Sequence, residues 1–249
     1  MLVSSFARTR SWTLIKSSSR SSPARRRKPR KKVRDQGVRQ LPRDVFHIAD
    51  AANWPGILSG GLLCTAEIAA RLGRDADVYE KLISFRPKSV EVPKVAYVRD
   101  QAPMPPQALR NCLDEGMTPG DWYGLVNGHV FFWLSMERVN RHLRALRKRP
   151  QILLTFDGWR LAEAYSETVF VTPFNVGAAL RRAAPRGRRT FVPVREWQKR
   201  AWTSEAASGC KPRSASHNPA ELVVRGSVPD AMNFLKEIQL KAEQPNDEA

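Results

Sequence analysis

The sequence has few cysteines, and the three that it has are far apart. Cys64, Cys112 and Cys210 form no CxxC pair, and none has a histidine at the spacing of zinc ligands. We therefore expect neither a disulfide framework nor a metal site, and we expect a reducing, cytoplasmic location. Long hydrophobic runs are also missing. No window reaches the ~18 to 20 consecutive apolar residues of a membrane span, which predicts no membrane partner.

Acidic residues are scarce at the start of the chain. Residues 1–43 contain 14 Lys or Arg but a single acid, Asp35, so most of the net charge of +18 lies in this segment. The segment is also rich in serine and contains the run RRRKPRKK. Its apolar residues are too few to offset the entropy of an ordered chain, which predicts a disordered basic arm over residues 1–42.

Three interpretations of this arm stay open. A solvated basic arm binds nucleic acid through the phosphate backbone, without sequence preference and with strong salt dependence. The Arg and Ser bias, with the apolar patch at residues 12–15, is also typical of an organelle-targeting peptide. The third interpretation is that the start codon was placed too far upstream, in which case the segment has no role.

The rest of the chain has the composition of a globular domain. With 249 residues and 42% hydrophobic content, the protein is large enough to bury one core, which we place at residues 43–241, followed by a frayed tail at 242–249. Apolar patterns predict strands at 45–48, 91–100, 130–134, 151–156, 167–172, 190–194 and 220–225. Helical patterns between the first two motifs described below predict a helical insertion. The fold class is therefore α+β.

The first motif is Arg43–Leu63, RDVFHIADAANWPGILSGGLL. Its strand signal carries His47 and runs into a small-residue helical turn that ends at two glycines. A histidine alone at a strand end is more often satisfied within the fold than catalytic. Here the histidine is followed by an Asn-Trp pair and a Gly-Gly-Leu. This order resembles the opening segment of ADP-ribosyltransferase-like proteins of the DarT type, and of an uncharacterised bacterial family of unknown function.

The second motif is Asn127–Leu143, NGHVFFWLSMERVNRHL. Phe131, Phe132 and Trp133 lie on the predicted strand, and Ser135 is a good N-cap for the helix that follows. An aromatic triplet on a strand is by default part of the core. Alternating residues face opposite ways, however, so one ring can be offered to a planar ligand while its neighbour packs inward. In the ADP-ribosyltransferase fold this position carries the aromatic that stacks on nicotinamide, often a tyrosine.

The third motif is Pro219–Asp230, PAELVVRGSVPD. Alternation places Leu222 and Val224 on one face of a strand and Glu221 on the other. A single glutamate on a strand usually faces solvent, but the order Ala-Glu, three apolar residues and a later Val-Pro resembles the segment with the catalytic glutamate of DarT-type enzymes. Upstream, the loop around Arg186, PRGRRTF, resembles the uncharacterised family. Its arginines fit either a solvated loop or a contact with pyrophosphate.

The resemblance implies a split β-sheet core and NAD as substrate. Glu221 would be the catalytic residue, which faces an oxocarbenium-like state with a negative charge. The implied cofactor-binding residues are His47, Phe131, Phe132, Trp133, Ser135 and Arg186, and no metal is required. The sequence departs from the pattern at Ala49, where a hydroxyl residue often stands.

Two functions follow from this pattern, and a third from the arm. The first is an NAD-dependent ADP-ribosyltransferase that modifies nucleic acid. The alternative is a catalytically degenerate module of the same fold that binds a nucleotide or nucleic acid without turnover. His47 together with Glu221 favours activity, whereas Ala49 and the absence of a tyrosine in the aromatic triplet favour degeneracy. A basic structural protein, in which the arm is the important part, is the third interpretation.

Overall fold

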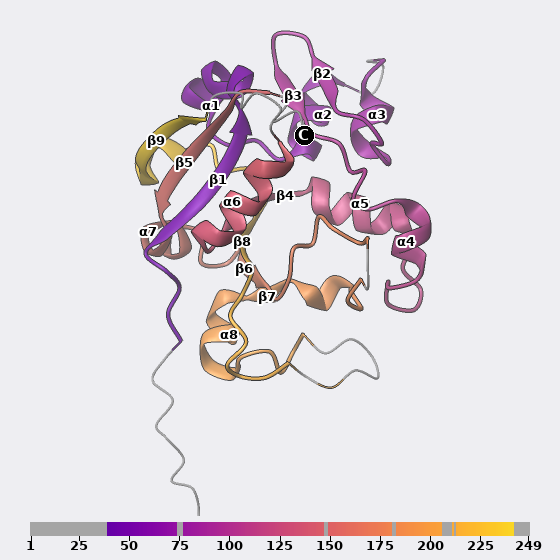
Figure 1. Ribbon diagram of the computed structural model, residues 1–249, viewed down its shortest axis with the longest axis vertical. Coiled ribbons are helices and arrows are strands. Elements are labelled where there is room, and N and C mark those ends of the chain that lie inside the picture. Colours follow the sequence, from indigo (N-terminus) through magenta and orange to yellow (C-terminus); the bar gives the residue numbers. More distant parts are fainter. Residues whose placement is uncertain are drawn as a thin grey trace, which may run out of the picture. The chain divides into compact units, whose positions relative to one another are not determined.

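The computed structural model describes residues 39–73, 77–146, 149–180, 183–205, 211 and 213–241, which belong to one compact unit (Figure 1). Seven strands form one antiparallel sheet in the order β7-β6-β8-β4-β1-β5-β9, and β2 pairs with β3 in a separate hairpin. With its helices, the fold is α+β, as the sequence predicts. Within the described ranges every helix is too short or too polar to span a membrane.

The strands are β1 (Asp44–Asp50), β2 (Val90–Val92), β3 (Ala96–Val98), β4 (His129–Trp133), β5 (Gln151–Asp157), β6 (Val169–Thr172), β7 (Val192–Pro193), β8 (Glu221–Arg225) and β9 (Leu235–Lys241). The α-helices are α1 (Trp54–Gly60), α2 (Thr65–Leu72), α3 (Tyr79–Ile83), α4 (Pro106–Arg110), α5 (Pro119–Asn127), α6 (Met136–Ala145), α7 (Gly158–Ala164) and α8 (Val194–Arg200). Short 3-10 turns are η1 (Ala51–Asn53), η2 (Arg188–Thr190) and η3 (Ala231–Phe234). The segment between β1 and β4 holds α1 to α5 and the hairpin.

Local sequence signals explain where several helices begin. At α5, the Thr118 hydroxyl accepts from the Asp121 N–H and the Asp121 carboxylate accepts from the Thr118 N–H, which completes a capping box. Ser135 caps α6 by accepting from the Arg138 N–H, and Asp157 caps α7 by accepting from two backbone N–H groups. These caps satisfy backbone donors that a helix leaves unpaired at its start.

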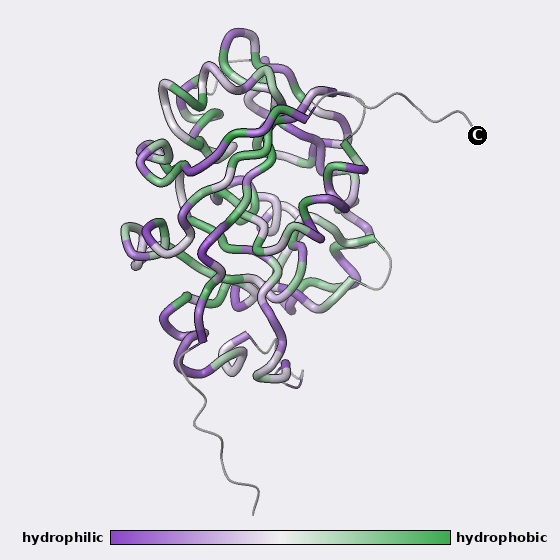
Figure 2. Tube along the Cα trace, turned by 60° about the vertical axis from the view of Figure 1, so that its left-hand side comes forward, coloured by the Kyte–Doolittle hydropathy of each residue, from purple (hydrophilic) through white to green (hydrophobic). Residues whose placement is uncertain are grey.

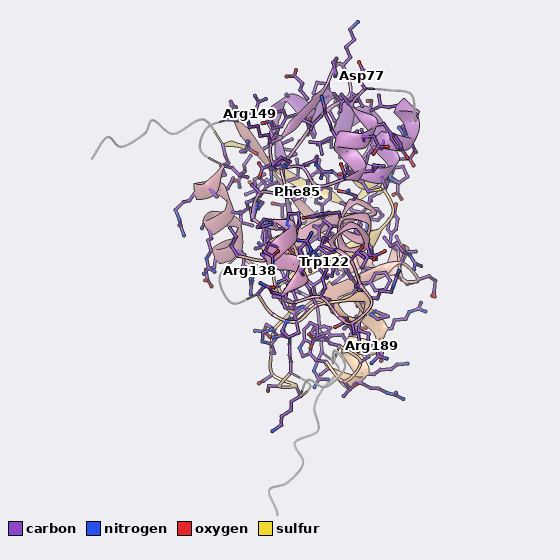
Figure 3. All side chains as sticks on the ribbon, turned by 90° about the vertical axis from the view of Figure 1, so that its right-hand side faces the viewer. Asp77, Phe85, Trp122, Arg138, Arg149 and Arg189 are labelled. Atoms are coloured by element: carbon purple, nitrogen blue, oxygen red, sulfur yellow. The ribbon has the colours of Figure 1, made fainter. Side chains whose placement is uncertain are left out.

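The main sheet is covered on both faces by separate hydrophobic clusters. One face carries the largest cluster, in which Phe132 and Leu222 pack with side chains of α7 and α8. On the other face, Val139 of α6 packs with β1 and β5, and Trp122 of α5 packs with Val223 of β8. Trp122 lies in the middle of the molecule in Figure 3, and hydrophobic stretches follow the central strands in Figure 2.

The sheet is nearly interrupted between β4 and β1. These strands share one registered pair, Phe46 with Trp133, whereas β1 and β5 share seven pairs and β4 and β8 share five. A side chain fills the gap in the ladder, since His47 Nδ1 lies 2.9 Å from the carbonyl oxygen of Phe131. The sheet therefore consists of two parts, β7-β6-β8-β4 and β1-β5-β9, which diverge at this point.

Two predicted strands are wrong in extent. Residues 91–100 form the β2–β3 hairpin and not one strand, because the chain reverses at Lys94, which has a φ of 61°, and the Val95 N–H donates to the Val92 carbonyl. Of residues 190–194, only Val192–Pro193 pair in the sheet. The next residue already begins α8, a helix that the sequence patterns did not predict.

The predicted arm and tail lie mostly outside the described residues. Residues 1–38 and 242–249 are not described, so the arm and the frayed tail stay predictions. The described end of the arm segment packs on the domain. Leu41 is buried, and its carbonyl accepts a hydrogen bond from Trp159 Nε1 at 2.8 Å.

Candidate active site

A cavity of about 700 Å³ lies where the two parts of the sheet diverge. Its walls come from β1, β4, the start of β8, helix α6 and the hairpin β2–β3. Five of the residues predicted from the sequence line it: His47, Phe131, Phe132, Trp133 and Glu221. Ser135 and Arg186 do not line it. Residues from both ends of the domain and from its middle therefore meet around one space.

Glu221 is a buried carboxylic acid at the first position of β8. Its Oε2 accepts hydrogen bonds from the Thr172 hydroxyl at 2.7 Å and from the Val176 N–H at 3.2 Å. Burial raises the pKa of Glu221 to about 7, although these hydrogen bonds and the positive charges of Arg138 and Arg186 act in the opposite direction. Near neutral pH the group is therefore divided between its acid and carboxylate forms.

The aromatic strand β4 presents its rings on both faces of the sheet. Trp133 is the direct cross-strand partner of Glu221, so these two side chains leave the sheet on the same face. Phe131 shares that face two residues earlier, and both rings are partly exposed. Phe132 points the other way, is 1% exposed and packs edge-on against Phe156. Trp133 is thus the ring closest in the sheet to the carboxyl group.

His47 is held in its neutral form with one nitrogen unused. Burial, assisted by the nearby charge of Arg99, lowers the pKa of His47 to about 4, although its hydrogen bond to Phe131 acts against this. Because a carbonyl can only accept, Nδ1 of the imidazole must carry the proton. In the neutral ring Nε2 therefore holds a lone pair, and it has no partner among the described residues.

A second histidine, which the sequence patterns did not single out, supports the tryptophan. His142 of α6 lies edge-on to Trp133, and its Nδ1 accepts a hydrogen bond from Trp133 Nε1 at 3.1 Å. Burial and the charges of Arg99 and His47 lower the pKa of His142 to about 4. An imidazolium has no lone pair to accept with, so the low pKa and this hydrogen bond agree.

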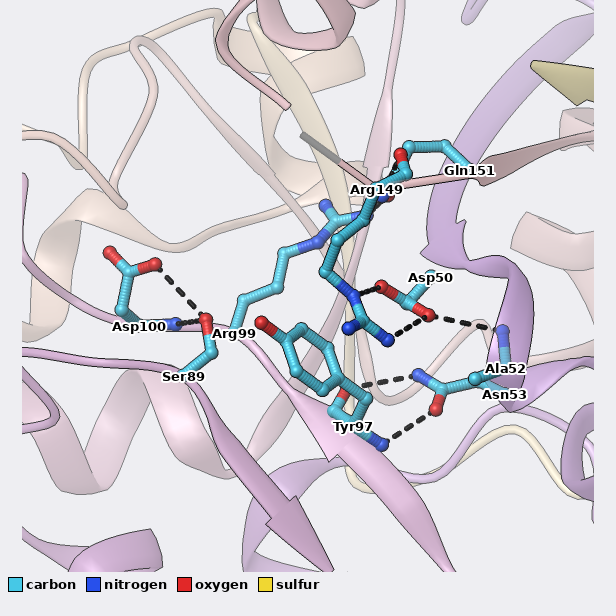
Figure 4. Close-up of polar contacts among 9 residues, drawn as sticks. All are labelled: Asp50, Ala52, Asn53, Ser89, Tyr97, Arg99, Asp100, Arg149 and Gln151. Atoms are coloured by element: carbon cyan, nitrogen blue, oxygen red, sulfur yellow. Dashed lines mark hydrogen bonds and ion pairs between the residues drawn. The ribbon is translucent and has the colours of Figure 1, made fainter. Parts of the chain in front are cut away.

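A polar network lies beside the hairpin (Figure 4), and its members Asp50, Asn53 and Tyr97 line the cavity. Asp50 is 3% exposed and forms a two-point ion pair with Arg149, whose nitrogens lie 2.6 and 3.2 Å from its oxygens. Burial raises the pKa of Asp50, but the hydrogen bonds from Arg149 and Ala52 reverse this and hold the pKa below its ordinary value. The Arg149 guanidinium also lies 4.0 Å from the centre of the Tyr97 ring.

Asn53 fastens the hairpin to this network. Its side-chain amide accepts from the Tyr97 N–H at 2.7 Å and donates to the Tyr97 carbonyl at 3.0 Å. The Asn-Trp pair of the first motif therefore has a structural contact that explains its asparagine. Sequence reasoning missed Asp50, Tyr97 and Arg149, because only the folded chain brings their segments together.

Arg186 and Ser135 have other positions than the resemblance implies. Arg186 is 2% exposed, donates to the carbonyl oxygens of Val176 and Ala184, and lies over the rings of Trp122 and Phe174. It therefore belongs to the core behind the cavity and supports the Val176 segment that bonds Glu221. Ser135 is the N-cap of α6.

No metal site is visible in the described part of the chain. No group of three or more His, Cys, Asp or Glu there is arranged to hold an ion. Cys64 and Cys112 are buried and free, and Cys210 lies outside the described residues.

Comparison with known proteins places most of the chain in one family. A family model described as "Family of unknown function (DUF7002)" matches residues 43–235, which includes every predicted site residue. A search of the curated proteins finds no match. The match confirms the resemblance to an uncharacterised family of unknown function, whereas the resemblance to DarT-type enzymes stays a prediction.

Proposed function

The chain belongs to the DUF7002 family of unknown function, and we propose that it is an NAD-dependent ADP-ribosyltransferase whose active site is the cavity between β1, β4 and β8. The observation that carries this proposal is the meeting of His47, Trp133 and Glu221 around one cavity. The resemblance assigns the three residues to one reaction, and they are separated by 86 or more positions in the sequence. A volume of about 700 Å³ also suits a ligand larger than a single ion.

The proposed reaction breaks the bond between the ribose C1 atom and the nicotinamide nitrogen. The bonding electron pair leaves with nicotinamide, and positive charge develops on the ribose. An acceptor nucleophile then forms the new bond to C1 and loses its proton. The carboxylate of Glu221 faces the developing charge from a fixed position, which stabilises the transition state more than the ground state.

The other residues hold the substrate in this scheme. The Nε2 lone pair of His47 accepts a hydrogen bond from a ribose hydroxyl, because Nδ1 is already used by the Phe131 carbonyl. Trp133 offers a ring to nicotinamide next to Glu221, its partner across the strands. We assign neither residue to proton transfer. The basic residues of the N-terminal segment suit a nucleic-acid acceptor.

The alternative is a degenerate module of the same fold that binds a nucleotide without turnover. The observation in its favour is Ala49, which is 6% exposed and packs in the largest core cluster. A methyl group there supplies no hydroxyl to a substrate. Binding then still uses His47 and Trp133, but no NAD is cleaved, with or without the carboxylate of Glu221.

Incubation of the full chain with labelled NAD and with DNA, RNA or protein acceptors tests the proposal. Glu221→Gln keeps an acceptor oxygen for Thr172 and Val176 but removes the charge, so we expect the rate of NAD cleavage to fall about 10² to 10³-fold with most NAD affinity retained. The control is Glu237→Gln on the exposed side of β9, which should leave the rate unchanged. Equal rates in wild type and Glu221→Gln would overturn the mechanism.

A further inference from the structure

Arg99, which follows β3, is a cavity arginine without an ion pair in the described part of the chain. Its guanidinium donates one hydrogen bond, to the side-chain oxygen of Gln151. The other arginines that line the cavity have different surroundings. Arg86 donates to the Asn127 side chain and Arg141 pairs with Glu137, whereas Arg138 places its positive charge near Glu221. Arg149 lies beside the cavity and pairs with Asp50. A half-buried guanidinium that faces a cavity and has unused donors is suited to bind an anion.

The charges around Arg99 leave a positive excess. One buried carboxylate, Asp50, lies near both Arg99 and Arg149, and it already makes its ion pair with Arg149. Asp100 also lies nearby, but it is exposed, and its carboxylate accepts a hydrogen bond from the Ser89 hydroxyl, to which the Asp100 N–H donates in turn (Figure 4). Water screens an exposed carboxylate far more than a buried one.

The two histidines near Arg99 carry no charge near pH 7. His47 and His142 lie close enough for the charge of Arg99 to lower their pKa values, and both are neutral near pH 7. A neutral imidazole can still accept from a ligand hydroxyl or donate to a ligand oxygen.

The position of Arg99 is fixed before any ligand binds. Asn53 holds both backbone groups of Tyr97, two residues before Arg99, and Arg149 covers the Tyr97 ring. The Arg99 carbonyl is held as well, by a hydrogen bond from the buried Arg86 side chain at 3.1 Å. Such preorganisation lowers the entropy lost on binding.

We propose that Arg99 forms a phosphoryl-binding subsite of the cavity, which holds the diphosphate of a nucleotide. The planar guanidinium matches two phosphate oxygens at once, and the cavity has room for the nucleoside beside it. This inference deepens the proposed function and rests on it for the use of the cavity as a nucleotide site. The phosphate contact that the resemblance implied for Arg186, a core residue, is thereby assigned to Arg99, next to the hairpin.

Calorimetric titration of the full chain with ADP and with adenosine tests the subsite. We expect Arg99→Gln to weaken ADP binding about tenfold or more and to leave adenosine binding within about twofold. Arg141→Gln is the matched control, because it removes the same charge from an exposed, ion-paired arginine of the cavity rim. Arg141→Gln should change ADP affinity by less than about twofold. The basic N-terminal segment is present in all variants, so any ADP that it binds does not change the comparison.

Several outcomes would overturn the inference. The first is that wild type does not bind ADP. The second is that Arg99→Gln and Arg141→Gln lose the same amount of ADP affinity. The third is that Arg99→Gln loses as much affinity for adenosine as for ADP. Arg99→Lys guards against misfolding, since it keeps the charge and should retain part of the affinity. The assay involves no NAD cleavage. ADP binding that depends on Arg99 in a protein that never cleaves NAD would reject the transferase and leave the subsite standing.

Discussion

Glu221 and Trp133 are direct partners across the β8–β4 ladder, at the edge of the gap between β4 and β1. Trp133 is also the one residue of β4 that is registered with β1, where its partner is Phe46. The carboxyl group and the tryptophan ring therefore occupy the place where the sheet opens. Their side chains share a face, so a ligand in the cavity can contact both.

NAD cleavage should rise with pH around neutrality. Burial raises the pKa of Glu221 to about 7, and only its ionised form offers a charge to the transition state. We expect kcat/KM to increase about tenfold per pH unit below pH ~7 and to level above it. His47 and His142 are already neutral in this range. A flat profile between about pH 6 and pH 8 would contradict the assignment of Glu221.

The stability of wild type and Glu221→Gln should diverge with pH. A raised pKa means that folding favours the protonated acid, so the stability that this group contributes is complete below about pH 4.5 and is lost as pH rises through about 7. Gln has no such dependence. We expect the melting temperature of Glu221→Gln, relative to wild type, to rise by roughly 5 °C between about pH 5 and pH 8. If the difference in melting temperature between the two proteins stays constant over this pH range, the pKa of Glu221 is not raised by folding.

Substitutions of the neighbouring residues Phe132 and Trp133 should have different effects, one on stability and the other on NAD binding. Phe132 is 1% exposed, so Phe132→Leu should lower the free energy of unfolding by about 2 kcal/mol through lost packing. Trp133 is partly exposed in the cavity, so Trp133→Leu should weaken NAD binding about tenfold at a smaller cost in stability. Denaturant unfolding and calorimetry measure the two effects. Similar destabilisation by both changes with NAD affinity untouched would leave Trp133 a core residue only.

Arg186 should act on catalysis through Glu221. It donates to the Val176 carbonyl, and the N–H of the same residue donates to Glu221. Arg186→Gln should therefore loosen that segment and shift the midpoint of the pH–rate profile upward. Arg188→Gln, at an exposed neighbour, serves as the control. A fall in rate without a shift of the midpoint would indicate a structural role alone.

The basic N-terminal segment should contribute to nucleic-acid binding and little to stability. Deleting residues 1–36 removes most of the excess charge and should weaken binding to DNA or RNA at low salt, with an unchanged melting temperature. Deleting residues 1–42 also removes Leu41, which is buried, and should lower the melting temperature. Filter binding and thermal melts compare the two deletions. A lower melting temperature for the shorter deletion would contradict the predicted disorder.

Local signals in the sequence determined much of the secondary structure. The alternation in Glu221–Arg225 set which of its residues share a face, because successive side chains of a strand point to opposite sides. Thr118 and Ser135 marked helix starts, because a cap depends on residues within one turn. The approximate positions of β1, β4, β5 and β8 followed from such nearby patterns.

Only the tertiary structure decided which side chains surround the cavity. Arg186 and Arg99 carry the same group, yet one is enclosed by Trp122 and Phe174 and the other faces the open space. The local sequence around each arginine did not reveal which of the two faces the cavity. The difference arises from contacts between segments far apart in the chain, such as that between Asn53 and Tyr97, and these depend on how the whole sheet and its hairpin pack.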